Sequence, residues 1–336
     1  MRELKILVIV AVVIGVIYWG VEPLAHSIMH PKVADAEYDF VKANKADIEQ
    51  IKQNIADLES KIKAAQETGD KQMIDRLQKS LEKAKSVLSN LDGFWSTLDF
   101  SKGNPIAGRE QVEQCLACHT ITSQKLSRST GQSDLEVSEA YGVTPPDLSN
   151  VAAVFDHNYL AHFLKDPVLA SKLWHKDDFN YPMPGYAWLG DDAIVDIVAY
   201  FISIAPKELS NKQVFEQACM RCHSVGYDNL ASPSAPQNIE RYLGTVAPDL
   251  SMMIRARGEH YLSNFINDPQ RLLPNTSMPR VGVTEQSEQQ IIAYLDSVGD
   301  SKKDERNALG FKIILFFVIM AVLAYLWKRK IWSDLH

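Results

Sequence analysis

The chain has 336 residues, with 35 lysines and arginines against 42 aspartates and glutamates, so its formal net charge is −7. This length allows two or three domains. The acidic balance argues against a protein that binds the phosphate backbone of nucleic acids, although a basic soluble partner remains possible.

The N-terminus carries an apolar segment. Residues 6–21 contain no charge and follow a short basic stretch. At about 1.5 Å per residue, such a helix falls slightly short of a bilayer core of roughly 30 Å, so a signal peptide and an anchor both fit. A cleaved signal peptide is followed closely by an A-x-A site, but the nearest one, at Ala34 and Ala36, lies far downstream. We therefore expect a retained membrane anchor over residues 1–30.

The C-terminus carries a second apolar segment. Residues 309–327 contain one charge, Lys312, and are followed by Lys328, Arg329 and Lys330. A helix that is apolar on every face and stops at a basic cluster is typical of a membrane span, which we expect over residues 305–330. Because basic residues mark the cytoplasmic side, both termini are expected in the cytoplasm and the intervening chain outside it.

Residues 34–92 are highly charged and nearly free of glycine and proline. Apolar residues recur there at steps of three and four, first at Ile48, Ile51, Ile55, Leu58 and Ile62, and then at Ile74, Leu77, Leu81, Ala84, Leu88 and Leu91. Gly69 and Asp70 interrupt this pattern and suit a helix C-cap and a helix N-cap. The pattern predicts an antiparallel helical hairpin over residues 31–94, which is either a spacer or brace or a docking arm for a partner.

All four cysteines lie in two C-x-x-C-H motifs, formed by Cys115, Cys118 and His119 and by Cys219, Cys222 and His223. Zinc would need more ligands, and no other histidine forms an H-x₃₋₅-H pair with either motif at finger-like distance. A disulfide fits an external compartment but does not require the histidine. Haem c requires the whole motif, because the two thiols bond the haem vinyl groups and the histidine binds the iron. Two complete motifs therefore favour haem over zinc or a thiol oxidoreductase.

An electron-transfer haem needs a sixth iron ligand, and a methionine sulfur raises the reduction potential. Met183, in YPMPGY, lies 64 residues after His119, and Met278, in TSMPRV, lies 55 residues after His223. Both precede a proline, and we expect them to bind the two irons. The alternatives are that each methionine only packs against the haem edge, or that the ligand is another residue, for which the candidates are Met252, Met253, His157, His162, His175 and His260.

The two motifs belong to a duplicated unit. Residues 146–149, PDLS, recur at 248–251, and YLAHFLKDP at 159–167 recurs as YLSNFINDP at 261–269, both 102 residues later. Each copy then continues through a methionine loop into a final helix, which is the sign of a repeated domain. Strand signals are few, so we expect two small all-helical domains over residues 95–206 and 207–300.

Each copy resembles class I cytochrome c in its C-x-x-C-H motif, its proline loop and its methionine loop. In that family the proline carbonyl accepts a hydrogen bond from the haem histidine, a role that the resemblance assigns to Pro146 and Pro248; a plain turn proline is the alternative. The copies differ four residues before the first cysteine, where the second has Phe215 and the first has Gln111. We expect the helix around Gln111 to pack differently, against the hairpin or a partner.

From end to end, the apolar N-terminus, the hairpin, the two haem units and the basic C-terminal span resemble the di-haem c-type subunit of bacterial bc-type quinol–cytochrome c oxidoreductases. The resemblance implies an all-α chain with two tandem class I cytochrome c domains and two covalently bound haem c groups. It also implies that His119, Met183, His223 and Met278 bind the irons. The chain would be a membrane-anchored electron carrier on the periplasmic side of the bacterial inner membrane, without catalytic residues of its own.

The resemblance further implies that electrons pass from a Rieske iron–sulfur protein to a soluble cytochrome c or a terminal oxidase, in a dimeric complex that includes cytochrome b. The first alternative is the di-haem subunit of a cbb-type cytochrome c oxidase. The C-terminal span and the hairpin argue against this alternative. The second is a di-haem peroxidase, which needs an iron with an open sixth position. No nucleic acid partner is expected.

Overall fold

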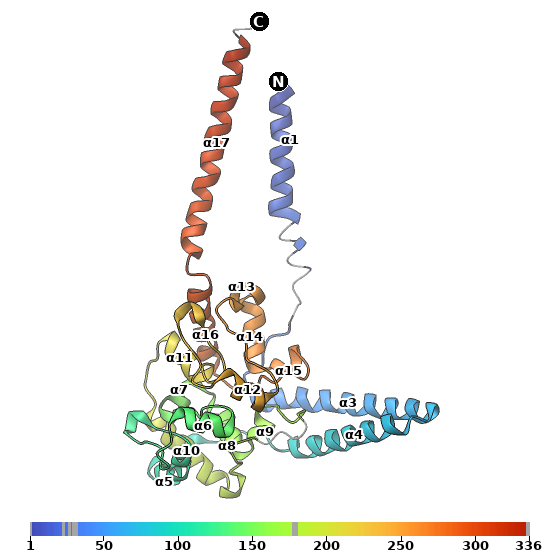
Figure 1. Ribbon diagram of the computed structural model, residues 1–336, viewed down its shortest axis with the longest axis vertical. Helices are drawn as coiled ribbons and strands as arrows, with labels where there is room; N and C mark the ends of the chain where they lie inside the picture. The colour runs from blue at the N-terminus through green and yellow to red at the C-terminus, as the bar shows by residue number, and fades with distance from the viewer. Residues whose placement is uncertain (1, 22–23, 26–27, 29–32, 177–180, 334–336) are drawn as a thin grey trace. The chain divides into compact units, whose positions relative to one another are not determined.

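The computed structural model describes residues 2–21, 24–25, 28, 33–176 and 181–333. Within these residues the chain is helical (Figure 1), and strand-like pairing is limited to isolated bridges between Ile121 and Leu126, Phe155 and Val283, and Val225 and Leu230. The predicted all-α fold class is confirmed. The anchor expected over residues 1–30 lies partly outside the described residues, which omit 1, 22, 23, 26, 27, 29 and 30.

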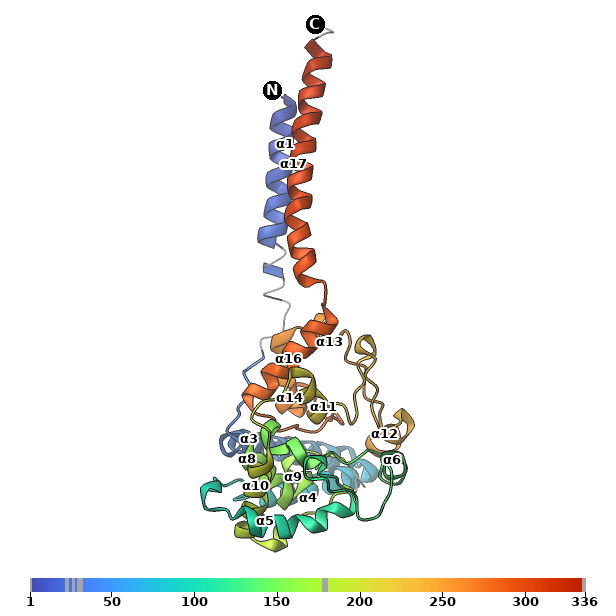
Figure 2. The ribbon, with the colours of Figure 1, turned by 90° about the vertical axis from the view of Figure 1, so that its left-hand side faces the viewer.

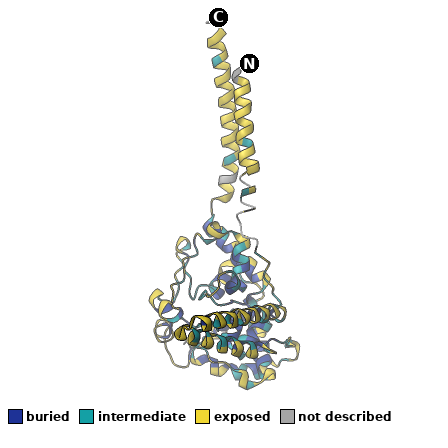
Figure 3. Ribbon diagram, turned by 90° about the vertical axis from the view of Figure 1, so that its right-hand side faces the viewer, coloured by how far each residue is buried: buried dark blue, intermediate teal, exposed yellow. Residues whose placement is uncertain are grey.

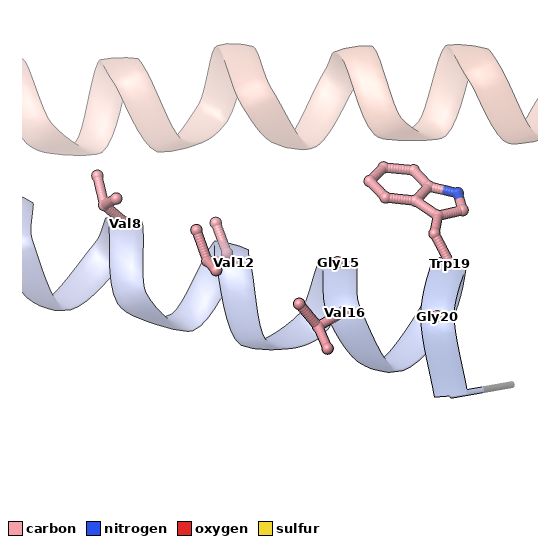
Figure 4. A pocket seen from close by; sticks show the side chains of 7 residues that line it. Val8, Val12, Gly15, Val16, Trp19 and Gly20 are labelled. Atoms are coloured by element: carbon pink, nitrogen blue, oxygen red, sulfur yellow. The ribbon is translucent and has the colours of Figure 1, made fainter.

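Both ends of the chain form apolar helices. At the N-terminus α1 (Arg2–Val16) continues as π-helix over Ile17–Val21, and at the C-terminus α17 spans Lys303–Ser333. By length and composition each could cross a membrane, and the most apolar window of each contains no buried residue (Figure 3). A groove along α1 is lined by small and apolar residues, including Val8 and Trp19 (Figure 4). These surfaces are compatible with membrane anchoring.

The predicted helical hairpin is present. Its two helices, α3 (Phe40–Thr68) and α4 (Lys71–Leu91), lie antiparallel and side by side (Figure 1). The first ends at Gly69, whose φ of 73° is the left-handed conformation that glycine adopts most easily. Asp70 then caps α4 by accepting a hydrogen bond from the backbone N–H of Met73. We refer to α3 and α4 together as the hairpin.

The repeated part of the chain follows the hairpin. The first repeat contains α5 (Pro105–Gln111), α6 (Asp134–Tyr141), α7 (Val151–Val154), α8 (His157–Lys165), α9 (Pro167–Ala170) and α10 (Asp191–Ile204). The second contains α11 (Asn211–Ala218), α12 (Pro236–Leu243), α13 (Met253–Arg257), α14 (Glu259–Asn267), α15 (Pro269–Leu272) and α16 (Glu285–Gly299). Short 3₁₀ turns occur at Phe100–Lys102, Val112–Ala117, Thr122–Gln124, Leu148–Asn150, Ala187–Leu189 and Gly226–Asp228. Figure 2 shows α6 and α12 next to each other, so the repeats also meet away from their cores.

An aromatic cluster buries the base of the hairpin against the first repeat. The rings of Phe40 and Trp95 stack with their centroids 5.5 Å apart, and the ring of Tyr159 in α8 lies 5.0 Å from that of Phe40. On its other side Trp95 stacks with His162, also in α8, at 4.7 Å. Since aromatic side chains bury large apolar areas, this cluster fixes where the hairpin leaves the first repeat.

The first helix of each repeat packs on the last, but through different contacts. In the second repeat Phe215 of α11 is fully buried, and its ring lies 4.8 Å from that of Tyr294 in α16. In the first repeat α5 comes so close to α10 that a Cβ added to Gly108 would lie 1.9 Å from the carbonyl oxygen of Asp196. The helix around Gln111 does pack differently: within the chain it packs on α10 and not on the hairpin, because a glycine there permits close approach. Packing of this helix against a partner stays a prediction.

A short backbone pairing joins the two repeats. The N–H of Asp156 donates to the carbonyl of Gly282 at 2.9 Å, and the N–H of Thr284 donates to the carbonyl of Val154 at 3.1 Å. Gly282 has a φ of 75°, and a Cβ added to it would lie 2.1 Å from the ring of Tyr159. The site therefore admits only glycine. One contiguous apolar core runs through both repeats.

His162 gives the first repeat a pH-dependent contribution to stability. Its ring is fully buried, with Nε2 accepting a hydrogen bond from the N–H of Ser96 at 3.1 Å and Nδ1 donating to the carbonyl of Asn158 at 2.7 Å. Burial lowers the pKa of His162 below its ordinary value of 6.5, because a charged ring would lack water there. As the pH falls below 6.5, the unfolded chain takes up this proton first, so the free energy of unfolding decreases.

We expect His162→Asn to remove this pH dependence, because the second repeat has Asn264 at the equivalent position. At neutral pH the variant should lose about 1–3 kcal/mol of unfolding free energy, since the contact with Trp95 is reduced. Between about pH 7.5 and pH 5.5 the unmodified chain should lose more stability than the variant. Denaturant unfolding followed by circular dichroism measures both effects, and equal losses with pH would contradict this role for His162.

Candidate haem sites

Each C-x-x-C-H motif forms a single helical turn. In the first, the N–H of Cys118 and the N–H of His119 both donate to the carbonyl of Cys115, at 3.1 and 2.9 Å. In the second, the corresponding bonds of Cys222 and His223 to Cys219 measure 3.2 and 3.0 Å. The first turn begins within the 3₁₀ segment Val112–Ala117, whereas the second begins directly after α11. The same turn is thus formed next to a 3₁₀ segment in the first repeat and next to an α-helix in the second.

The two motif histidines have the same ring orientation. Nδ1 of His119 lies 2.8 Å from the carbonyl oxygen of Pro146, and Nδ1 of His223 lies 2.8 Å from that of Pro248. Because a carbonyl can only accept, Nδ1 carries the hydrogen and Nε2 keeps its lone pair. Burial lowers the pKa of His119 to about 4 and lowers that of His223 as well. Both rings are therefore neutral near pH 7, with Nε2 available to a metal.

Asp147 and Asp249 hold the loops that present these carbonyls. The carboxylate of Asp147 accepts from the hydroxyl of Thr120 and from the N–H groups of Thr122 and Ser149, at 2.8, 3.0 and 2.8 Å. In the second repeat Asp249 accepts from three groups at equivalent positions, Ser224 Oγ, Gly226 N–H and Ser251 N–H, at 3.0, 2.8 and 2.9 Å. No role was predicted for these aspartates from the sequence. The recurrence of PDLS is the pattern that could have identified them.

The four motif cysteines are free, and burial favours the protonated form of three of them. Burial raises the pKa of Cys115 to about 11 and that of Cys219 to about 12, and it also raises the pKa of Cys222. A catalytic or zinc-binding thiol is activated instead by a lowered pKa. Across the described residues, no group of three or more His, Cys, Asp or Glu side chains is placed to hold a metal ion. These observations give no support to the zinc and thiol-oxidoreductase interpretations.

Both motifs open onto one cavity of about 380 Å³. This volume lies within the range of small-molecule and cofactor sites, about 300–1,000 Å³. Of the residues expected to bind haem, the cavity is lined by Cys115, Cys118, His119, Pro146, Met183, Cys219, Cys222, His223 and Met278. Pro248 is not among the lining residues, although its carbonyl contacts His223. The structure thus brings both methionine loops to the cavity that contains both motifs.

The other candidate ligands have contacts elsewhere. His157 is hydrogen-bonded to the carbonyl of Ala152 at 2.9 Å, and His175 to that of Lys172 at 3.1 Å. Met252 is exposed, and Met253 packs against the apolar core. The described residues that line the cavity do not include these four side chains or His162 and His260.

The remaining lining residues fit a haem. Most are apolar or aromatic, including Leu160 and Phe201, as a porphyrin face requires. Arg221, which lies between the two cysteines of the second motif, also lines the cavity, and its buried Nε has no hydrogen-bond partner among the described residues. A carboxylate of the kind that haem carries would pair with this cation. Haem c uses all of these groups: thiols for covalent attachment, a neutral imidazole and a thioether sulfur as iron ligands, and a cation to pair with its carboxylates.

Comparison with known proteins places these features in a family. The family model for cytochrome c matches residues 106–204 and 211–299, and the model for the cytochrome c1 family matches residues 280–335. A solved structure described as "Hyperthermophilic respiratory Complex III" is 25% identical, covers 38% of this chain and 75% of its own, and has a TM-score of 0.32. Among curated proteins the comparison found no match.

The two cytochrome c matches cover more than half of the chain and coincide with the two C-x-x-C-H turns, their proline loops and their methionine loops. Membership in this family implies covalently bound haem c. The chain therefore belongs to the cytochrome c family and carries two cytochrome c domains in tandem.

Proposed function

We propose that this chain is a membrane-anchored di-haem electron carrier, the c-type subunit of a bc-type quinol–cytochrome c oxidoreductase. The observation that carries the proposal is the single cavity, onto which both motifs and both methionine loops open. When bound, haem iron accepts and releases one electron. The two family matches support two haem groups, one for each repeat over residues 95–206 and 207–300.

The chain's own residues would hold each haem and set its potential. The thiols of each motif would supply the two thioether bonds, and Nε2 of His119 or His223 would bind the iron. The proline carbonyls keep each ring in one tautomer and make its free nitrogen more basic. Met183 and Met278 supply sixth ligands, whose sulfur favours the reduced state. Two methionines at the cavity leave no open position for peroxide, which speaks against a di-haem peroxidase.

The proposal for the membrane topology and the partner proteins is supported by the match of the C-terminal residues to the cytochrome c1 family model. The cytochrome c1 match includes α17, which is long and apolar enough to cross a membrane. We propose that the haem domains face the periplasm with both termini in the cytoplasm, as the basic end of α17 favours. Electrons would then arrive from a Rieske iron–sulfur protein and leave to a soluble cytochrome c or a terminal oxidase, in a dimeric complex with cytochrome b.

Purification of the tagged chain from membranes in mild detergent tests the assignment. We expect cytochrome b and a Rieske protein to co-purify with it, and quinol to reduce its haem groups in the purified complex. Recovery with copper-containing oxidase subunits, and without a Rieske protein, would show instead that the chain serves a cbb-type oxidase.

The number of haem groups can be measured through the cysteines. We expect a Cys219→Ser, Cys222→Ser double variant to lower the covalently bound haem from two groups per chain to one, because each thiol pair attaches its own haem. The matched Cys115→Ser, Cys118→Ser variant should retain the other haem. Haem and protein are quantified after denaturing extraction. A full haem content in either variant would contradict attachment at that motif.

Asp147 offers a test of the proline loops. We expect Asp147→Ala to lower the unfolding free energy of the haem-loaded chain by about 1–3 kcal/mol, because two backbone N–H groups and one hydroxyl lose their acceptor. Asp249→Ala is the matched control. Asp249 is exposed, so water replaces the lost bonds, and its effect should stay below about 1 kcal/mol. Denaturant unfolding measures both, and a loss below about 1 kcal/mol in Asp147→Ala would show that the first loop does not depend on this carboxylate.

A further inference from the structure

Three buried charged side chains and the half-buried Asp268 join the hairpin to both repeats. Asp47 of α3 lies with Oδ1 2.6 Å from Nζ of Lys172 and with Oδ2 2.9 Å from the guanidinium of Arg280. Lys172 also lies 2.8 Å from Asp268, the carboxylate that follows α14. The side chains of Asp47, Lys172 and Arg280 are 4%, 3% and 1% exposed, so these pairs have almost no solvent around them.

Arg280 is the point where the three parts of the chain meet. Its backbone N–H donates to the carbonyl of Ser171 at 2.9 Å, and its carbonyl accepts from the hydroxyl of Tyr159 at 2.6 Å. Its Nε donates to the carbonyl of Asn267 at 3.2 Å, and its guanidinium lies 5.8 Å from the ring centroid of Phe40 at the base of the hairpin. The backbone and the side chain of one residue are thus held by the hairpin, the first repeat and the second repeat.

The two buried cations of this cluster depend on the hairpin for a compensating charge. Burial would raise the pKa of Asp47, but the charges of Arg280 and Lys172 outweigh it, so the pKa lies below its ordinary value. Asp268 also pairs with Arg271, at 3.2 Å, so it does not by itself balance both Lys172 and Arg280. Without the carboxylate of Asp47, one cation would remain buried with no compensating charge, which is strongly unfavourable. The segment around Arg280 would have to move to give that charge access to water.

Met278 lies two residues before Arg280 in the same loop. Both residues line the haem cavity, and the carbonyl of Met278 accepts from Nε2 of Gln270 at 2.6 Å. The first repeat has Gly185 two residues after its own Met183. A Cβ added to Gly185 would lie 2.5 Å from the carbonyl oxygen of Lys165, so close backbone packing holds the first methionine loop. The second loop depends on a buried ion pair instead.

We propose that Asp47 is a positioning residue for Met278: through Arg280, the hairpin holds the methionine loop of the second haem site in place. This inference rests on the proposed ligation of the second iron by Met278. It gives the hairpin a role beyond that of a spacer or brace. The first site does not share this dependence.

The variant Asp47→Asn in the full-length, haem-loaded chain tests the proposal. The amide keeps the shape of the side chain and removes its charge. We expect the charge-transfer band that a methionine–iron bond gives to ferric haem to fall to about half, because one of the two sites loses its methionine. The potential of one haem should fall at the same time. Asp57→Asn is the matched control, because Asp57 belongs to the same helix and its ion pair with Lys61 is exposed.

Two further variants separate this inference from the function on which it rests. Met278→Ala should also halve the band, and combining it with Asp47→Asn should produce no further loss. A full band in Met278→Ala would overturn the ligation itself. A half band in Met278→Ala with a full band in Asp47→Asn would overturn only the role of the hairpin.

If Asp47→Asn does not accumulate, Arg280→Lys replaces it as the test. Lysine keeps the positive charge but lacks the guanidinium fork that reaches both Asp47 and the carbonyl of Asn267. We expect this variant to weaken the band of the second site, with the covalent haem content unchanged. An undiminished band would overturn the proposal.

Discussion

Two backbone hydrogen bonds between residues 154–156 and 282–284 set how the two haem domains meet. They form the one inter-domain strand-like pairing in the described residues. Buried backbone groups must be paired, so the register cannot slip without leaving donors unsatisfied. The pairing brings the loop after Met278 against α8, where Gly282 lies on the ring of Tyr159. The two motifs therefore line the same cavity.

Few uncompensated charges line that cavity. Burial keeps the two motif histidines neutral and favours the neutral form of the Cys115, Cys219 and Cys222 thiols. Among the described lining residues, Arg221 and Arg280 carry a permanent charge, and that of Arg280 is balanced by Asp47. Arg221 has no ion pair in the described part of the chain and lies close enough to act on both motifs. Interactions between charges are strong where water is excluded. The guanidinium of Arg221 therefore strongly affects the electrostatic energy of any charge placed in the cavity.

Sequence reasoning identified the parts whose signals are local. The hairpin caps at Gly69 and Asp70, the C-x-x-C-H turns and the recurring methionine loops each depend on residues close together in the chain. The contacts that assemble the parts were not predictable in this way. Asp47 lies in a charged helix where most carboxylates face water, and its partner Arg280 is 233 residues away. Likewise, nothing near Gly108 in the sequence indicates that Asp196 will press against it. Burial that arises only from tertiary packing leaves no local pattern.

The two copies diverged where their contact required it. Each domain uses a different surface: residues 154–156 of the first meet residues 282–284 of the second, which is a heterologous contact. Counting from the methionines, Val283 corresponds to Trp188. Val283 is fully buried in the contact, whereas Trp188 is 72% exposed. One sequence could not suit both a buried and an exposed surface. The presence of Arg280 where the first repeat has Gly185 follows the same logic, since the second methionine loop meets the hairpin and Arg280 pairs with Asp47 there.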